Sequence, residues 1–162
     1  MDKHKTNAMR ILDKEKIDYE ILTYDASDGL IDGISVAGKI GQPVGCVYKT
    51  LVTQGHSRNY YVFIIPVAEQ LDLKAAARSV GEKSVEMIKV SDINKVTGYI
   101  RGGCSPIGMK KSYTTVLDDS CKNLDYIIIS AGKIGHQIKI APSDLIGLIN
   151  CKTDSLIMRK QI

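Results

Sequence analysis

The sequence feature that most restricts the fold is a pair of consecutive β-rich segments in the first half of the chain. Residues 46–53 alternate in polarity and are rich in β-branched side chains, and the next segment is apolar up to its closing proline. The turn-forming residues Gly55, Ser57 and Asn59 separate the two. Together they predict a β-hairpin whose second strand, Tyr60–Pro66, is buried.

Other strand and helix signals follow one another without a regular order. Further strands are predicted at Tyr19–Tyr24, Val85–Met87, Thr114–Leu117, Tyr126–Ser130 and Gln137–Ile140. Helices are predicted from the capping residues Thr6, Asp72 and Ser143, with shorter helical segments at Ile34–Ile40 and Ser91–Gly98. Because regular strand–helix–strand units are missing, we expect an α/β (α+β) domain around a mixed, mostly antiparallel sheet rather than a Rossmann-type fold.

The composition is that of a soluble globular protein. The chain has 162 residues, of which 44% are hydrophobic and 25% charged, and no repeat or linker interrupts it, so a single domain over residues 1–162 is predicted. The longest apolar run, Tyr60–Ile65, is far too short for a membrane span of about 20 residues. No apolar segment typical of a secretory signal follows the N-terminus. We therefore expect a cytoplasmic protein without a membrane segment.

No motif for a cofactor, a metal ion or a protein nucleophile is present. The sequence has no phosphate-binding P-loop, no nucleophile elbow and no zinc-protease helix motif, and its 3 histidines are scattered. The 4 cysteines form no C-x-x-C pair; they are Cys46, Cys104, Cys121 and Cys151. They are interpreted as reduced thiols, and neither a metal ion nor a cofactor is expected.

Lys49 is the first residue that could carry chemistry. If Val47, Lys49 and Leu51 share one face of a strand, the ammonium lies among apolar neighbours, where its burial is costly unless an anion meets it. The alternative is a lysine at a sheet edge, with its stem packed and its ammonium in water.

The glycine-rich segment 98–108 is the second feature that could carry chemistry. Its adjacent glycines, Gly102 and Gly103, allow backbone N–H groups to approach a phosphate or a developing oxyanion. Ser105 adds a hydroxyl and Pro106 stiffens the segment. A tight connector between strands is the equal alternative.

Ser130–Gly135 is the third segment, and it is more typical of a hairpin turn than of a site. Most tyrosines are interpreted as packed strand residues, although Tyr48 or Tyr99 could stack on a base.

These segments, together with others in the same order, resemble the YbaK/EbsC family of aminoacyl-tRNA deacylases. The matching segments are Val47-Tyr-Lys-Thr-Leu51, Pro66-Val with Leu71-Asp-Leu-Lys74, Lys83 with Val85-Glu-Met87, Thr97-Gly-Tyr99, Gly102-Gly-Cys-Ser-Pro-Ile-Gly108 with Lys110-Lys111, and Ser130-Ala-Gly-Lys with Gly135. The resemblance covers nearly the whole chain and implies a curved, barrel-like mixed sheet flanked by helices. It also implies a trans-editing enzyme that removes cysteine from tRNA(Pro), and from tRNA(Cys), after the synthetase has released the product. Proline and cysteine are close in size, so a second site must sort them.

The resemblance further implies roles for individual residues. The family's essential lysine falls on Lys49, which is expected to hold the phosphate or ribose of the terminal adenosine or to polarise the ester. Gly102 and Gly103 are expected to bind the ester oxygen through their N–H groups. The residues expected to bind substrate are Tyr48, Thr50, Tyr99, Ser105, Pro106, Ser130, Gly132 and Gln137. A positioned water or the substrate's own thiol is expected to attack the ester, with Cys46 and Cys104 incidental.

Two departures from the family pattern bear on the amino acid that is removed. Gln137 stands where the cysteine-specific branch often has an acidic residue, and Leu30, Ile31 and Asp32 stand where an aromatic residue is expected. A deacylase for alanine or another small amino acid, or a non-catalytic tRNA- or synthetase-binding module, therefore stays open. The expected partner is the 3′ acceptor end of an aminoacyl-tRNA. A net charge of +4 predicts a weak grip on tRNA alone, and so recruitment through a prolyl- or cysteinyl-tRNA synthetase.

Overall fold

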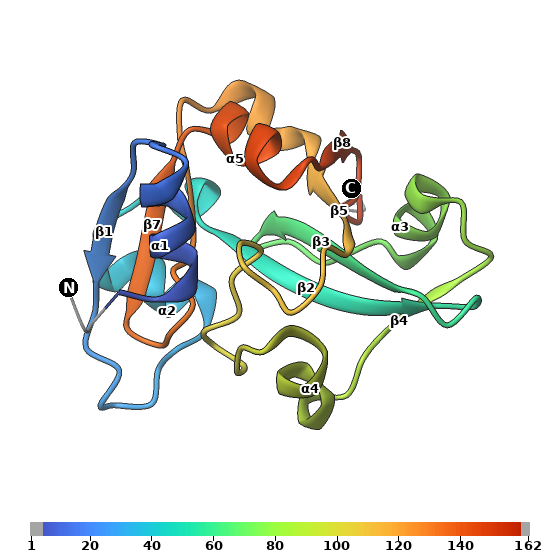
Figure 1. Ribbon diagram of the computed structural model, residues 1–162, viewed down its shortest axis with the longest axis horizontal. Helices are drawn as coiled ribbons and strands as arrows, with labels where there is room; N and C mark the ends of the chain where they lie inside the picture. The colour runs from blue at the N-terminus through green and yellow to red at the C-terminus, as the bar shows by residue number, and fades with distance from the viewer. Residues whose placement is uncertain (1–4, 160–162) are drawn as a thin grey trace.

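The computed structural model describes residues 5–159, which contain five α-helices and eight strands. Their arrangement is drawn in Figure 1. Residues 1–4, which include His4, and 160–162 lie outside this description. The helices are α1 (Asn7–Lys14), α2 (Gly33–Lys39), α3 (Leu73–Val80), α4 (Ile93–Thr97) and α5 (Pro142–Ile149). The strands are β1 (Glu20–Thr23), β2 (Tyr48–Gly55), β3 (Tyr60–Pro66), β4 (Val85–Met87), β5 (Thr114–Asp118), β6 (Ile127–Ser130), β7 (His136–Ile140) and β8 (Lys152–Asp154). No helix within residues 5–159 is long and apolar enough to cross a membrane.

The strands form two sheets. One has five strands in the order β4-β2-β3-β5-β8, antiparallel from β4 to β3 and parallel from β3 to β8. The other has three antiparallel strands in the order β1-β7-β6. A single parallel bridge between Val47 and Ile128 links them where β2 begins. The mixed α/β class and the hairpin of β2 and β3 are therefore confirmed. The single barrel-like sheet is corrected, because hydrogen bonding does not continue beyond this one bridge.

Strand β3 lies at the centre of the core and is buried on both faces. Since successive strand residues point to opposite faces, Ile64 packs with Leu12 of α1 in the largest buried cluster, whereas Phe63 and Ile65 pack under α3. All three β3 side chains have no exposed surface. Burial of each such side chain contributes about 1.5–3 kcal/mol to folding. The core thus fixes β3, and through its register with β2 it fixes Lys49 opposite Ile65.

The helix caps agree with the sequence in two cases and differ in a third. Thr6 accepts a hydrogen bond from the Met9 N–H, and Asp72 caps α3. The cap predicted at Ser143 is wrong: α5 starts one residue earlier with Pro142, whose missing N–H and fixed φ suit the first helical position. Strand β8 and the short 3₁₀ helix 119–123 were not predicted at all.

Candidate active site

A small cavity of about 120 Å³ opens beside the bridge that joins the two sheets. Six of the predicted site residues line it: Tyr48, Lys49, Thr50, Gly102, Ser130 and Gln137. They come from β2, the glycine-rich loop, β6 and β7, so segments far apart in sequence meet here. The other predicted residues, Gly103, Tyr99, Ser105, Pro106 and Gly132, do not line it.

Lys49 lies half-buried in the wall of this cavity. Val47 lines the same cavity, as the strand spacing predicts, whereas Leu51 packs against the second core cluster under α3. Burial lowers the pKa of the Lys49 ammonium, and the charge of Glu69 opposes that effect. Within residues 5–159 no hydrogen bond or ion pair holds the ammonium. A cation in this position is ready to meet an anionic or strongly polar ligand atom.

The hydroxyl of Thr50 is a second polar group without a partner. Its Oγ1 atom is buried and makes no hydrogen bond in the described structure. A buried hydroxyl left unpaired costs about 1–3 kcal/mol, so the fold retains this group at a cost. Because Thr50 lines the same cavity as Lys49, the pair defines the polar side of a ligand site.

The glycine-rich loop forms the opposite wall and is closely packed. Gly102 has a φ of +85°, and a Cβ there would lie 2.7 Å from Ile31 Cδ1. A Cβ on Gly103 would lie 3.0 Å from the backbone of Lys133 and Ile134. A side chain at Gly102 would therefore be strained by the positive φ and would displace Ile31, and one at Gly103 would press on the backbone of Lys133 and Ile134.

The prediction that Gly102 and Gly103 both offer a free N–H donor is wrong for Gly103. The Gly103 N–H donates to the Ile100 carbonyl at 3.0 Å and closes a turn, so it is not free for an ester oxygen. The Gly102 N–H makes no hydrogen bond with residues 5–159. One donor, at Gly102, thus remains at the cavity wall.

Four predicted residues support the site from behind. The Tyr99 hydroxyl donates to the Ile107 carbonyl at 2.6 Å, and Ser105 Oγ accepts from the Ile107 N–H at 3.2 Å. A Cβ on Gly132 would lie 2.9 Å from the Tyr99 ring. Tyr48 is buried in the core with its hydroxyl 2.6 Å from Ser120 Oγ. Because both tyrosine rings are buried, base stacking on Tyr48 or Tyr99 is excluded in this structure.

The segment Ser130–Gly135 is the turn of the β6–β7 hairpin, as its composition indicates. Ser130 Oγ accepts from the Gly132 N–H at 3.2 Å and so stabilises the turn. Ser130 also pairs with Gln137 across the two strands, and both line the cavity. The segment is therefore both a turn and part of the wall.

Cys104 lines the cavity, but its thiol is not activated. Burial raises its pKa to about 11, opposed by a hydrogen bond with Thr97. The thiolate is the reactive form, so Cys104 is protonated and unreactive at neutral pH. All four cysteines are free, and residues 5–159 contain no group of three or more His, Cys, Asp or Glu side chains that could hold a metal ion.

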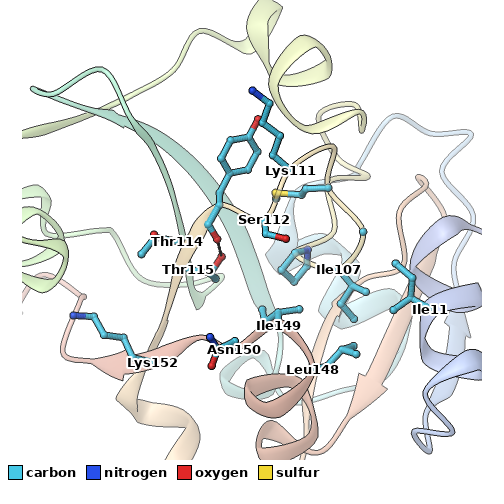
Figure 2. Close-up of a pocket in the computed structure, with 14 residues that line it drawn as sticks. Ile11, Ile107, Lys111, Ser112, Thr114, Thr115, Leu148, Ile149, Asn150 and Lys152 are labelled. Carbon is cyan, nitrogen blue, oxygen red and sulfur yellow. Dashed lines mark hydrogen bonds between the residues drawn. The ribbon is translucent and has the colours of Figure 1, made fainter.

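A larger groove of about 700 Å³ lies between α1, α5 and the segment 106–115 (Figure 2). Of the predicted residues only Pro106 lines it. Its titratable groups are Lys111, Lys152 and Tyr113, and the Lys152 ammonium donates to the Ser79 carbonyl. Among the described residues, none that lines this groove has a buried side-chain polar atom without a hydrogen bond, whereas Thr50 in the smaller cavity does, so the smaller cavity is the candidate active site.

Sequence reasoning missed part of the apolar lining of this cavity. Val47 and Val67 stand in the quoted motifs, whereas Gly33 and Val36 do not. Ile31 was singled out only as a departure from the family pattern. Glu69 lies in the turn after β3, and its charge raises the pKa of Lys49. No sequence signal pointed to this effect.

Comparison with known proteins shows the family of the chain. The model of the aminoacyl-tRNA editing domain family matches residues 34–148, a range that contains every cavity residue except Ile31 and Gly33. A curated Enterococcus faecalis protein, named as a candidate Cys-tRNA(Pro)/Cys-tRNA(Cys) deacylase (EbsC), is 44% identical over 146 residues, which cover 90% of this chain and 89% of the relative.

Solved structures show the same fold at low identity. A candidate trans-editing enzyme for prolyl-tRNA synthetase superposes with a TM-score of 0.81 at 21% identity, covering 96% of this chain and 99% of the other. A hypothetical protein designated APE2540 superposes with a TM-score of 0.86 at 15% identity, covering 94% of this chain and 100% of the other. The resemblance drawn from the motifs is confirmed, and the chain belongs to the aminoacyl-tRNA editing domain family.

Proposed function

We propose that this protein cleaves the ester of cysteine mischarged on tRNA(Pro), and that it also accepts Cys-tRNA(Cys). The observation that carries the proposal is that Lys49, a half-buried lysine, and Thr50, whose buried hydroxyl is unpaired, both line one small cavity. Family membership and the name of the Enterococcus faecalis relative support the same activity.

The size of the cavity favours a small amino acid. Its volume of about 120 Å³ is well above the roughly 10–15 Å³ that one water molecule needs. A cysteinyl side chain fits that space, whereas an adenosine does not. The terminal nucleotide therefore lies outside the cavity, and the ester lies at its mouth, near Lys49 and Gly102.

The available groups support positioning and electrostatic stabilisation rather than a protein nucleophile. Lys49 and the Gly102 N–H would face the oxygen on which negative charge develops. Because Cys104 is protonated, the attacking group is a bound water or the substrate's own thiol. In the second route the sulfur loses its proton and bonds to the carbonyl carbon, the ester C–O bond breaks, and the 3′ oxygen of the tRNA takes up a proton.

Recruitment by a synthetase is part of the proposal. With a net charge of +4, the protein offers few phosphate contacts beyond the acceptor end. A complex with prolyl- or cysteinyl-tRNA synthetase in the cytoplasm would deliver the mischarged tRNA before it is used.

The test is amino-acid release from Cys-tRNA(Pro), Cys-tRNA(Cys), Ala-tRNA(Pro) and S-methylcysteinyl-tRNA(Pro). We expect cysteine release in both tRNA contexts, at least about tenfold faster than alanine release, since small differences in side chain are worth roughly 10–200-fold. Cleavage of the S-methyl substrate would identify water as the nucleophile. Its resistance, together with no release of alanine, which is smaller than cysteine and lacks a thiol, would identify the substrate thiol. Faster release of alanine would contradict the assignment to cysteine, and no release of any amino acid would favour a binding module.

A further inference from the structure

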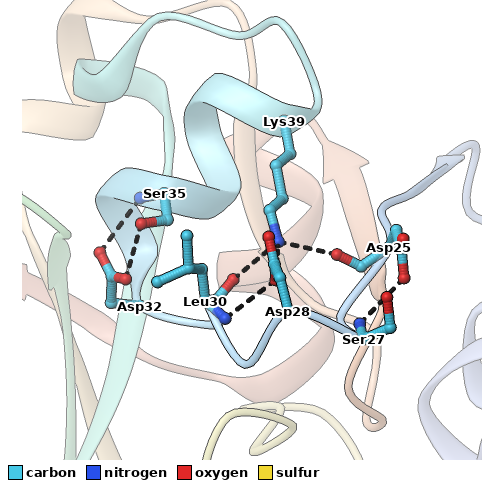
Figure 3. Close-up of polar contacts among 7 residues, drawn as sticks. All are labelled: Asp25, Ser27, Asp28, Leu30, Asp32, Ser35 and Lys39. Carbon is cyan, nitrogen blue, oxygen red and sulfur yellow. Dashed lines mark hydrogen bonds and ion pairs between the residues drawn. The ribbon is translucent and has the colours of Figure 1, made fainter.

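The ammonium of Lys39 is completely engaged by the loop that precedes its own helix (Figure 3). It donates to the Asp25 carbonyl at 2.7 Å, the Asp28 carboxylate at 2.7 Å and the Leu30 carbonyl at 3.0 Å. An ammonium has three N–H donors, and each has an acceptor here. The same group lies 5.7 Å from the centre of the Tyr24 ring.

Helix α2 thereby holds both ends of this loop. At its start, Asp32 accepts hydrogen bonds from the Ser35 N–H and hydroxyl. From its last turn, Lys39 reaches back across the loop. Asp28 also accepts the Leu30 N–H at 3.0 Å, and the hydrogen bond from Lys39, followed by that from Leu30, lowers the pKa of Asp28.

Ile31 lies between the two fixed points and forms part of the cavity wall. Its neighbours in sequence are Leu30, whose carbonyl binds Lys39, and Asp32, which caps the helix. Its Cδ1 atom is directed at Gly102, 2.7 Å from the position of a Cβ there. Ile31 thus lines the cavity beside Gly102, in a segment whose two ends are held by helix α2.

We propose that Lys39 is a positioning residue that sets the size of the amino-acid cavity through Ile31. This inference rests on the proposed deacylase function and deepens it, because it assigns selection against larger amino acids to a lysine that does not itself line the cavity. Loss of the three hydrogen bonds releases the loop, Ile31 withdraws from Gly102, and bulkier esters gain access.

The first experiment measures how firmly the loop is held and does not depend on catalysis. Amide hydrogen exchange is measured for the native chain and for Lys39→Met. Lys95→Met is the matched control. Lys95 also forms an ion pair with an aspartate, Asp92, at 3.7 Å, but this pair does not hold a loop in place. We expect the amides of Gly29 and Leu30 to exchange at least tenfold faster in Lys39→Met, with no change in the control. Unchanged protection in Lys39→Met would overturn the proposal even if the protein is a deacylase.

The second experiment measures selectivity for size as the ratio of kcat/KM for Cys-tRNA(Pro) over that for Leu-tRNA(Pro), which carries a bulkier amino acid. We expect this ratio to fall about tenfold in Lys39→Met and in Ile31→Ala, the scale of a change in pocket size. The double variant should show no further loss, because both changes act on one wall. Additive losses, or an unchanged ratio in Lys39→Met, would overturn the proposal. A native chain that releases no amino acid at all refutes the proposed function instead, and the exchange experiment still decides whether Lys39 fixes the loop.

Discussion

The Cδ1 atom of Ile31 occupies the space that any side chain at Gly102 would need, at 2.7 Å from an ideal Cβ. The two residues are neighbours in the lining of the candidate active site and come from segments separated by about half the chain. Because Gly102 has no side chain, the side chain of Ile31 can lie in that space. This contact ties the glycine-rich loop to the loop fixed by helix α2, and it leads to the first prediction.

Gly102→Ala is expected to impair both folding and activity. The φ of +85° costs a non-glycine residue about 1–2 kcal/mol, and the new methyl group also meets Ile31. We expect the free energy of unfolding, measured by urea denaturation, to fall by at least that amount. The kcat/KM for cysteine release should fall with it.

Gly147→Ala is the matched control for that substitution. Gly147 lies within α5 with open space around its Cβ position, so alanine should stabilise the protein by about 0.5–1 kcal/mol and leave activity unchanged. A Gly102→Ala variant as stable and active as the native chain would show that Gly102 and Ile31 are not in contact.

Thr50→Val should raise stability while it lowers activity. Valine keeps the shape of the side chain but removes a buried hydroxyl that has no partner in the free protein. We expect a gain of about 1 kcal/mol in the free energy of unfolding, since an unpaired buried polar group is removed. A loss of kcat/KM in the same variant would show that the hydroxyl meets the substrate. A loss of stability would instead indicate an internal partner for Oγ1.

Glu69→Gln is expected to shift the pH dependence of catalysis. Glu69 raises the pKa of Lys49 against the effect of burial, so its neutralisation lowers that pKa further. Lys49 then loses its proton at a lower pH, and the alkaline limb of kcat/KM should move to lower pH. The rate of uncatalysed ester hydrolysis is subtracted at each pH. Glu86→Gln, at an exposed position on β4, should leave the profile unchanged.

Cys104→Ser should retain most of the activity. The thiol has its pKa raised to about 11 by burial, so almost none of it is thiolate at neutral pH. Removal of a true nucleophile can cost on the order of 10⁶-fold in kcat, which separates the two possibilities clearly. Complete loss of cysteine release would contradict the assignment of Cys104 to the wall alone.

Local sequence signals predicted most of the secondary structure, because these elements agree with their own composition. The apolar run Tyr60–Pro66 forms β3 with the predicted bounds, and Asp72 and Gly81 delimit α3. Strand β8 was missed because Lys152–Asp154 has no apolar run and becomes a strand only by parallel pairing with β5. The division into two sheets was also not predicted, since the bridge between Val47 and Ile128 that joins them is a tertiary contact.

Most of the polar side of the site could be predicted, and only part of its apolar lining could. Lys49 and Gly102 belong to motifs that are legible in the sequence, and the structure places both at one cavity. Gly103 and Tyr99 belong to the same motif, yet the Gly103 N–H and the Tyr99 hydroxyl donate to other residues of the loop. Ile31 has no distinguishing chemistry, and only the three-dimensional contact with Gly102 reveals its position.

The most direct test of the account is cysteine release from Cys-tRNA(Pro) by Lys49→Ala under single-turnover conditions. Lys122→Ala, which removes an exposed lysine from the 3₁₀ helix after β5, is the control. We predict that Lys49→Ala loses at least about 10²-fold in rate, the scale of removing one group that stabilises developing charge, while Lys122→Ala keeps the native rate. Release by Lys49→Ala at the native rate would contradict a site centred on this lysine.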